Sequence, residues 1–268
     1  MKKLVLALTA VAAFSGSALA ADLPARTYTK APVVPVAPSW TGFYIFGGGG
    51  YGIFDSNSYV TNAAGVGLTN PLKVGGDGYF GTVGAGYDWQ FNGTWVAGIF
   101  GDGQFGSIKG SIADPLFGAI VGIPGGTTGS LKNTTNAAAG VRLGYLVAPN
   151  VLSYINGGYS YAEFDGSTER NIFGINVTTT PSFHRNGWFI GGGVENSLNF
   201  FGISAPGWFM KTEYRVAEYN RVTLPETFVP GIGTGLVGLS ISEKPIVQTV
   251  STSLVYRFNW GGPVVAKY

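Results

Sequence analysis

Hydrophobic and polar residues alternate with a period of two in residues 246–258, IVQTVSTSLVYRF. One face of the predicted strand ends in Leu254, Tyr256 and Phe258, whereas the opposite face is largely polar and carries Arg257. An apolar face that ends in aromatic residues is typical of a strand that faces lipid and reaches a membrane interface. Because no backbone group can stay unpaired in lipid, we predict that this strand closes a barrel by pairing with other strands of the chain.

Seven further segments have the pattern of strands, namely residues 40–54, 79–90, 94–105, 136–147, 151–164, 186–198 and 208–219. The facing of residues 151–164, which are rich in tyrosine, is not clear from the pattern. Asn92-Gly93 is a strong signal for a tight hairpin turn between two of the segments. The first segment contains the glycine run Gly47–Gly50, but no Lys-Ser or Lys-Thr pair and no helical pattern follow it. We therefore interpret the run as close packing in a narrow barrel rather than a phosphate-binding loop.

The connections between the predicted strands are alternately long and short, and the long ones are residues 55–76, 107–134, 165–183 and 220–245. This alternation is typical of outer-membrane barrels, which have short periplasmic turns and long external loops. The predicted fold is all-β: an eight-stranded antiparallel up-and-down transmembrane β-barrel with four long external loops. The even strand count predicts that both ends are periplasmic. Ten strands remain an alternative, in which one long connection folds back through the membrane.

Both ends of the chain differ in composition from the predicted barrel. Lys2 and Lys3, an apolar run over residues 4–14 and the sequence Ala18-Leu19-Ala20 predict a signal peptide over residues 1–20 and export through the Sec pathway. Residues 21–38 contain four prolines and are predicted to be a periplasmic linker. The barrel then covers residues 39–258, and residues 259–268 form a C-terminal tail.

Composition excludes several classes of function. Removing Lys2 and Lys3 from the 16 basic residues leaves 14, which balance the 14 acidic residues, so we expect no nucleic-acid partner. There is no cysteine, which excludes disulfides, thiolate metal sites and a cysteine nucleophile. Neither HExxH nor an EF-hand spacing occurs, and we predict neither a metal nor another cofactor.

Eight charged residues lie on the predicted inner faces of the strands: Asp88, Asp102, Arg142, Glu195, Lys211, Glu213, Arg215 and Arg257. Four are acidic and four are basic, and side chains fill the interior of a barrel with about eight strands. Because a lone buried charge is costly, we predict that these residues pair and plug the lumen, with Glu195 and Glu213 as the foremost partners of Arg257. The alternative is a narrow ion pathway that the same groups line.

A second candidate site is the pair Ser182 and His184, which lies near the predicted external end of a strand. Residues two apart in a strand share a face, so such a pair could act on lipid as nucleophile and base. No orienting acid is evident nearby in the sequence. The long connections are also unusually apolar, with Phe117, Ile120, Val121, Phe173, Phe228 and Val229. These residues either pack as hairpins or form a contact surface.

Six segments resemble one family of proteins: WTGFYI (40–45), VGAGYDWQF (83–91), GVRLGY (140–145), GWFIGGGVE (187–195), MKTEYR (210–215) and SLVYRFNWGGPVVAKY (253–268). The chain resembles the small, porin-family outer-membrane β-barrel proteins of alphaproteobacteria such as rhizobia and brucellae. Asn196 departs from the family, which usually has an aromatic residue after Val-Glu. The resemblance implies an abundant envelope and surface protein of the Gram-negative outer membrane. It also implies that the barrel-assembly machinery recognises a C-terminal aromatic residue, either Phe258 or Tyr268.

The predicted function is that of an integral outer-membrane barrel with a structural and cell-surface interaction role and without catalysis. A small passive diffusion channel is the first alternative, and a membrane-embedded lipid-modifying enzyme is the second. The expected partners are outer-membrane lipid and lipopolysaccharide, the barrel-assembly machinery, and host or phage molecules that reach the external loops.

Overall fold

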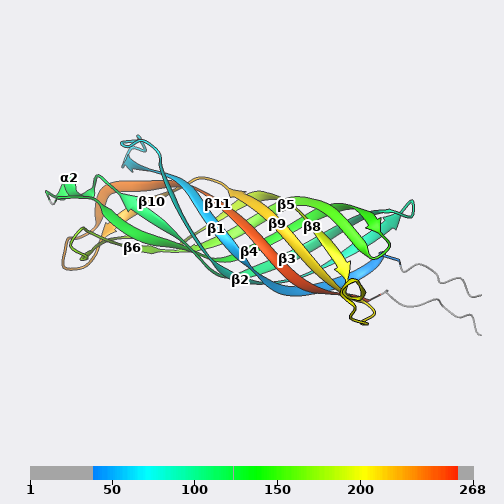
Figure 1. Cartoon of the computed structure of the whole chain (residues 1–268). Helices are drawn as coiled ribbons and strands as arrows, with labels where there is room; N and C mark the ends of the chain where they lie inside the picture. Colours follow the sequence, from blue (N-terminus) through cyan, green and yellow to red (C-terminus); the bar gives the residue numbers. More distant parts are fainter. Residues whose placement is uncertain (1–38, 123, 259–268) are drawn as a thin grey trace, which may run out of the picture. The chain divides into compact units, whose positions relative to one another are not determined.

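The computed structural model describes residues 39–122 and 124–258, which form one antiparallel sheet. Eight strands form a closed ring (Figure 1): β1 (Gly42–Asn62), β2 (Leu72–Phe91), β3 (Trp95–Asp114), β4 (Thr127–Ala148), β5 (Val151–Asp165), β8 (Phe183–Ser197), β9 (Trp208–Tyr219) and β11 (Leu236–Arg257). The last strand closes the ring against the first, from Tyr44 opposite Arg257 to Asn62 opposite Leu239. The predicted eight-stranded up-and-down barrel is therefore confirmed.

The alternation of residues along the strands sorts side chains between the interior and the outer surface. In β11, Val247, Ser253 and Val255 are buried inside, whereas Val250 and Leu254 are half exposed on the outside. Large aromatic residues occupy the interior because glycines face them. A β-carbon at Gly86 would overlap the Tyr44 ring, and one at Gly84 would overlap the Phe46 ring. In the run Gly47–Gly50, a β-carbon at Gly48 would overlap the β11 backbone and one at Gly50 would also overlap the Phe80 ring, so close packing is confirmed at these two positions.

Aromatic residues on the outer surface form two groups with aliphatic residues between them. The first group is Phe43, Tyr87, Trp89, Phe91, Trp95, Tyr145, Trp208, Tyr256 and Phe258, and the second is Tyr51, Tyr79, Phe105, Tyr159, Trp188 and Tyr214. Exposed aliphatic residues such as Ile45, Val83 and Ile99 lie between the groups. Phe43 and Tyr51 are eight residues apart, which corresponds to roughly 26 Å along a strand. The nine residues from Phe43 to Tyr51 match the length of a tilted membrane-spanning strand, and the band has the aromatic borders of a membrane-spanning barrel surface.

The two ends of the ring differ in their connections. Residues 92–94, residues 149–150 and residues 198–207, which contain the short 3-10 helix η1 (Leu198–Phe201), join strands at the end where β1 begins and β11 ends. Asn92 and Gly93 have φ angles of 49° and 74°, which a type I′ turn requires. We call this the short-turn end. The predicted signal peptide, linker and tail, and with them Tyr268, lie outside the described residues.

The four long connections, residues 55–76, 107–134, 165–183 and 220–245, contain strands over most of their length rather than irregular loops. β1, β3, β4 and β11 extend well into them, and three short strands add to the sheet: β6 (Ser167–Arg170), β7 (Asn176–Thr180) and β10 (Val222–Phe228). The pattern failed because these strands carry polar residues on both faces, such as Asp55 and Ser56, or prolines such as Pro225. Both features are loop signals in a sequence.

The short strands bridge β4 to β11 in the order β4–β6–β7–β10–β11, at the end opposite the short turns (Figure 1). We call β6, β7 and β10, together with the parts of β1, β2, β3, β4 and β11 beyond the second aromatic group, the distal tier. Because β6, β7 and β10 pair only in this tier, they add no ninth or tenth spanning strand. The helix α2 (Phe117–Val121) joins β3 to β4 there. None of the helices in the described residues is long and apolar enough to cross a membrane.

Candidate functional site in the barrel interior

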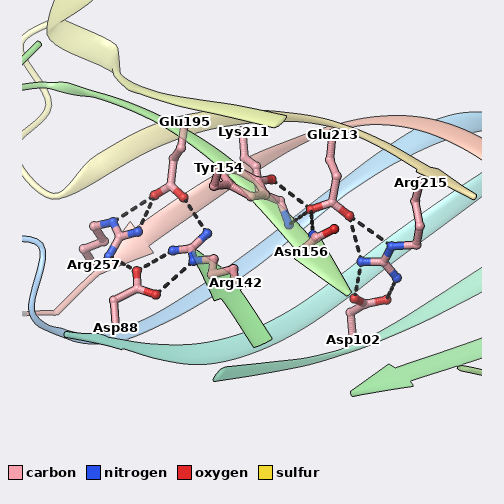
Figure 2. Close-up of polar contacts among 10 residues, drawn as sticks. All are labelled: Asp88, Asp102, Arg142, Tyr154, Asn156, Glu195, Lys211, Glu213, Arg215 and Arg257. Atoms are coloured by element: carbon pink, nitrogen blue, oxygen red, sulfur yellow. Dashed lines mark hydrogen bonds and ion pairs between the residues drawn. The ribbon is translucent and has the colours of Figure 1, made fainter. Parts of the chain in front are cut away.

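Six strands of the ring bring the eight predicted interior charges together. β2 carries Asp88, β3 carries Asp102, β4 carries Arg142, β8 carries Glu195, β11 carries Arg257, and β9 contributes Lys211, Glu213 and Arg215. All eight side chains are buried in the interior, and none is more than 8% exposed. They form two groups along the barrel, which Figure 2 shows.

The first group consists of two carboxylates and two guanidinium groups. The Arg142 Nε donates a hydrogen bond of 2.9 Å to Asp88, and its Nη1 donates one of 3.1 Å to Glu195. Arg257 bridges the same two acids, with 2.8 Å from Nη1 to Asp88 and 2.8 Å from Nε to Glu195. The group is therefore a closed, formally neutral ring of ion pairs. The two guanidinium groups also lie over the Tyr44 ring, 4.4 and 4.9 Å from its centroid.

The second group is also formally neutral. Arg215 makes a two-pronged contact with Asp102, at 3.0 and 2.7 Å, and a third bond of 2.7 Å to Glu213. The Lys211 Nζ is 3.7 Å from the other Glu213 oxygen, which also accepts hydrogen bonds from Tyr154 and Asn156. The Lys211 ammonium group lies 3.5 Å from the centroid of the Phe46 ring. Hydrogen-bonded pairs of this kind offset the cost of removing charges from water.

One predicted partner was wrong. Glu213 does not contact Arg257, because Glu213 lies opposite Ser251 on the last strand, six residues from Arg257 and therefore roughly 20 Å away along it. Asp88 takes the place that we predicted for Glu213.

Tyr154 and Asn156 were not predicted as interior residues, because the pattern of residues 151–164 leaves their facing unclear. The short turn at residues 149–150 could have predicted their position. It sets Arg142 directly opposite Asn156, and residues opposite each other in neighbouring strands lie on the same face of the sheet, so both side chains point inward.

Little free volume remains beside the second charge group. A cavity lined by Gln104, Asn136, Ser160, Arg215 and Tyr219, among others, has a volume of about 10 Å³. A cavity of about this size holds one water molecule. The free volume of this cavity therefore accommodates about one water molecule.

The structure places Ser182 and His184 on the exposed outer surface of the barrel. The sequence shows no acid near His184, but Glu163 lies directly opposite it on β5. The Glu163 carboxylate accepts a hydrogen bond of 3.1 Å from Tyr161, whose ring stacks on the His184 ring at 5.7 Å. No hydrogen bond joins Ser182 to His184 among the contacts of the described residues. The described part of the chain also contains no group of three or more histidine or acidic residues suited to a metal.

A closed eight-stranded ring, an apolar band with aromatic borders and a charged interior define an outer-membrane β-barrel protein. The chain belongs to the family described as outer membrane protein beta-barrel domain, whose model matches residues 6–258.

Two relatives and one solved structure support the assignment. The chain is 29% identical over 266 residues to the 31 kDa outer-membrane immunogenic protein of Brucella melitensis, with 96% of this chain and 100% of that protein covered. The protein of the same name from Brucella suis matches to the same extent. The crystal structure of OprG from Pseudomonas aeruginosa matches with a TM-score of 0.50 and 10% identity, covering 83% of this chain and 99% of OprG. The predicted alphaproteobacterial family and the Gram-negative outer-membrane location are thus confirmed.

Proposed function

We propose that this surface protein has a structural and interaction role, and that its lumen is closed by the two charge groups. The observation that supports closure is that all eight interior charges are buried and belong to two neutral sets of ion pairs. Opening a pathway for ions would require these pairs to separate. Breaking a buried pair leaves an uncompensated charge, which typically costs about 3–5 kcal/mol.

The distal tier supports the interaction part of the proposal. We propose that it extends outside the cell, with the short turns in the periplasm. Phe117 is buried in the tier, whereas Ile120 is 53% exposed and Phe173 is 66% exposed. Some apolar residues therefore pack in the tier, and others are available for contact with lipopolysaccharide, host molecules or phage. The proposed role does not include catalysis.

A planar-bilayer measurement tests the closed lumen. We predict that the wild-type protein gives no stable open-channel current in potassium chloride. The double variant Asp88→Ala with Arg142→Ala removes a buried ion pair and its volume without changing the net charge, and we expect it to show openings. The matched control is Lys132→Ala with Asp165→Ala, which removes an exposed pair separated by 3.4 Å. Stable currents from the wild type would show instead that the protein is a diffusion channel.

A further inference from the structure

Four acidic residues are buried in the distal tier, well beyond the apolar band. They are Asp114 on β3, Glu169 on β6, Glu226 on β10 and Glu243 on β11, and each is 0% exposed. None of them takes part in the ion pairs found among the described residues. The charges in the barrel interior are therefore paired, whereas these four acids of the distal tier are not in ion pairs with other described residues.

The carboxyl groups of Asp114 and Glu169 both lie within hydrogen-bonding reach of the Glu226 carboxyl. Protein donors reach only some of their oxygens. Glu169 Oε2 accepts bonds of 2.6 Å from Thr127 and 3.4 Å from Thr178, and Asp114 Oδ1 accepts one of 2.7 Å from the Leu116 amide.

Six carboxyl oxygens in the tier have no hydrogen-bond partner of ordinary geometry. They are Asp114 Oδ2, Glu169 Oε1, and both oxygens of Glu226 and of Glu243. The buried hydroxyls of Ser56 and Ser58, which flank Glu243, also lack such a partner. An unpaired buried acceptor is costly, so these oxygens need hydrogen atoms. The Ser56 and Ser58 hydroxyls lie close enough to Glu243 to donate to it, whereas the groups within reach of Glu226 are the carboxyl groups of Asp114 and Glu169. Because the carboxyl groups of Asp114, Glu169 and Glu226 lie within reach of one another, protons that they share can supply hydrogen atoms at these positions.

The surroundings favour protonated carboxyl groups. Burial, followed by the Glu169 and Asp114 charges, raises the pKa of Glu226 to about 10. Burial raises the pKa of Glu243 to about 7, and it also raises the pKa values of Asp114 and Glu169. The Arg221 charge acts in the opposite direction and lowers the pKa of Glu243. Its guanidinium donates at 3.3 Å to the Asn57 carbonyl and lies 4.9 Å from the centroid of the Tyr59 ring.

The distal tier also contains a small apolar cluster, whose members come from β1, α2, β7, β10 and β11. Val60, Phe117, Val177, Val237 and Leu239 form the buried part of this cluster, and Leu116, Val121 and Phe228 pack against it. The Phe117 and Phe228 rings meet edge to face at 6.2 Å. Phe117 is three residues from Asp114, and Phe228 is two residues from Glu226. Ionisation of the acids would therefore disturb the packing that holds α2 and β10 in place.

We propose that Asp114, Glu169, Glu226 and Glu243 form a proton-operated latch that holds β6, β7, β10 and α2 together in the distal tier. Shared protons allow a carboxylic acid to donate to a neighbouring carboxylate, whereas full ionisation leaves like charges in contact. The latch acts on the distal tier alone, so it goes beyond the proposed closed lumen and does not depend on it.

The direction of the pH dependence follows from the raised pKa values. In the folded tier these acids keep their protons at a pH where the unfolded chain has already lost them. The stabilisation is thus complete below about pH 4.5, the ordinary value for glutamate, and declines as the pH rises towards the folded values. For Glu243, the decline extends to about pH 7, and for Glu226 to about pH 10.

Hydrogen exchange of the full-length mature protein in lipid nanodiscs, read by mass spectrometry, tests the latch. Rates are corrected for intrinsic exchange, and EDTA is present. We expect opening of β6, β7 and β10 to increase at least about ten-fold between pH 6 and pH 8, because one carboxyl group with the folded pKa of Glu243 gives that change. The spanning parts of β5, β8 and β9 serve as the internal reference and should not change.

Variants separate proton release from other causes. Glu226→Gln with Glu243→Gln should remove most of the pH dependence, because glutamine does not ionise, while the control Glu163→Gln, at an exposed position, should retain it. Unchanged hydrogen exchange in the reference strands β5, β8 and β9 shows that the variants still fold. The proposal is overturned if the tier shows no pH dependence, or if the double variant retains it. It is also overturned if millimolar calcium restores protection of the wild type at pH 8, since that result identifies a metal site.

Discussion

At the scale of single residues, the barrel interior depends on complementary sizes and charges. Arg142 is the centre of the first charge group, because it contacts both Asp88 and Glu195. Gly98 leaves the space that Asp88 needs, since a β-carbon at Gly98 would overlap the Asp88 carboxylate. Asp88 and Glu195 are fully buried, so water cannot replace a lost ion-pair partner. Its stability therefore depends on every member of the group.

We predict that Arg142→Met destabilises the barrel by about 3–5 kcal/mol, because methionine fills part of the volume but leaves Asp88 and Glu195 with one cation between them. Denaturant unfolding in micelles, followed by tryptophan fluorescence, measures the change.

The matched control for this prediction is Lys132→Met. Lys132 pairs with Asp165 at 3.4 Å, but both side chains are exposed, so the expected loss is about 0–1 kcal/mol. Equal losses in the two variants would mean that the interior pairs contribute no more than a surface pair.

At the scale of elements, β11 is the strand on which the sheet depends most. It pairs with β1 along nearly its whole length, with β9 through the apolar band and with β10 in the distal tier. Its regular pairing ends close to Phe258, whose amide donates a bond of 3.1 Å to the Phe43 carbonyl. The Phe258 ring also meets the Tyr256 ring edge to face at 5.2 Å. Phe258 is thus part of the first aromatic group.

We predict that a chain ending at Phe258, without residues 259–268, still inserts into the outer membrane, because the pairing and the aromatic border are complete at Phe258. Heat-modifiable migration of outer-membrane fractions on gels measures insertion. A chain that also lacks Phe258 is the control, and we expect it to insert less. If the chain ending at Phe258 stays in the periplasm, the assembly signal requires the tail.

At the scale of the whole barrel, the two ends of the ring are different surfaces. One end has short turns and the first aromatic group, and the other carries the distal tier with its buried acids. Phe173, in the β6–β7 connection, and Phe200, in the β8–β9 connection, are both 66% exposed at opposite ends. They provide a matched pair of positions for a test of orientation.

We predict that a membrane-impermeant maleimide labels Phe173→Cys in intact cells, but labels Phe200→Cys only after the outer membrane is permeabilised. The chain has no cysteine of its own, so each label reports one position. The reverse pattern would show that the distal tier is in the periplasm.

The alternation of residues was sufficient to predict the strands of the apolar band. In the band, lipid accepts only apolar side chains, whereas the interior also accepts charged and polar ones beside its aromatic residues and glycines, so most of these strands show their facing in the sequence. The eight interior charges followed from this facing. Outside the band the outer surface meets water, and the distal strands were predicted as loops for that reason. Asp114, Glu169, Glu226 and Glu243 were missed with them.

The sequence by itself therefore determined the spanning strands, the closure of the sheet and the inward position of the charges, because each of these depends on local alternation. Only the tertiary structure decided which charges meet. Arg142 and Glu195 are 53 residues apart, and Arg215 and Asp102 are 113 apart, so their contact depends on strand register across the lumen. The same holds for the distal acids, which come together only because β6, β7 and β10 complete a second tier of the sheet.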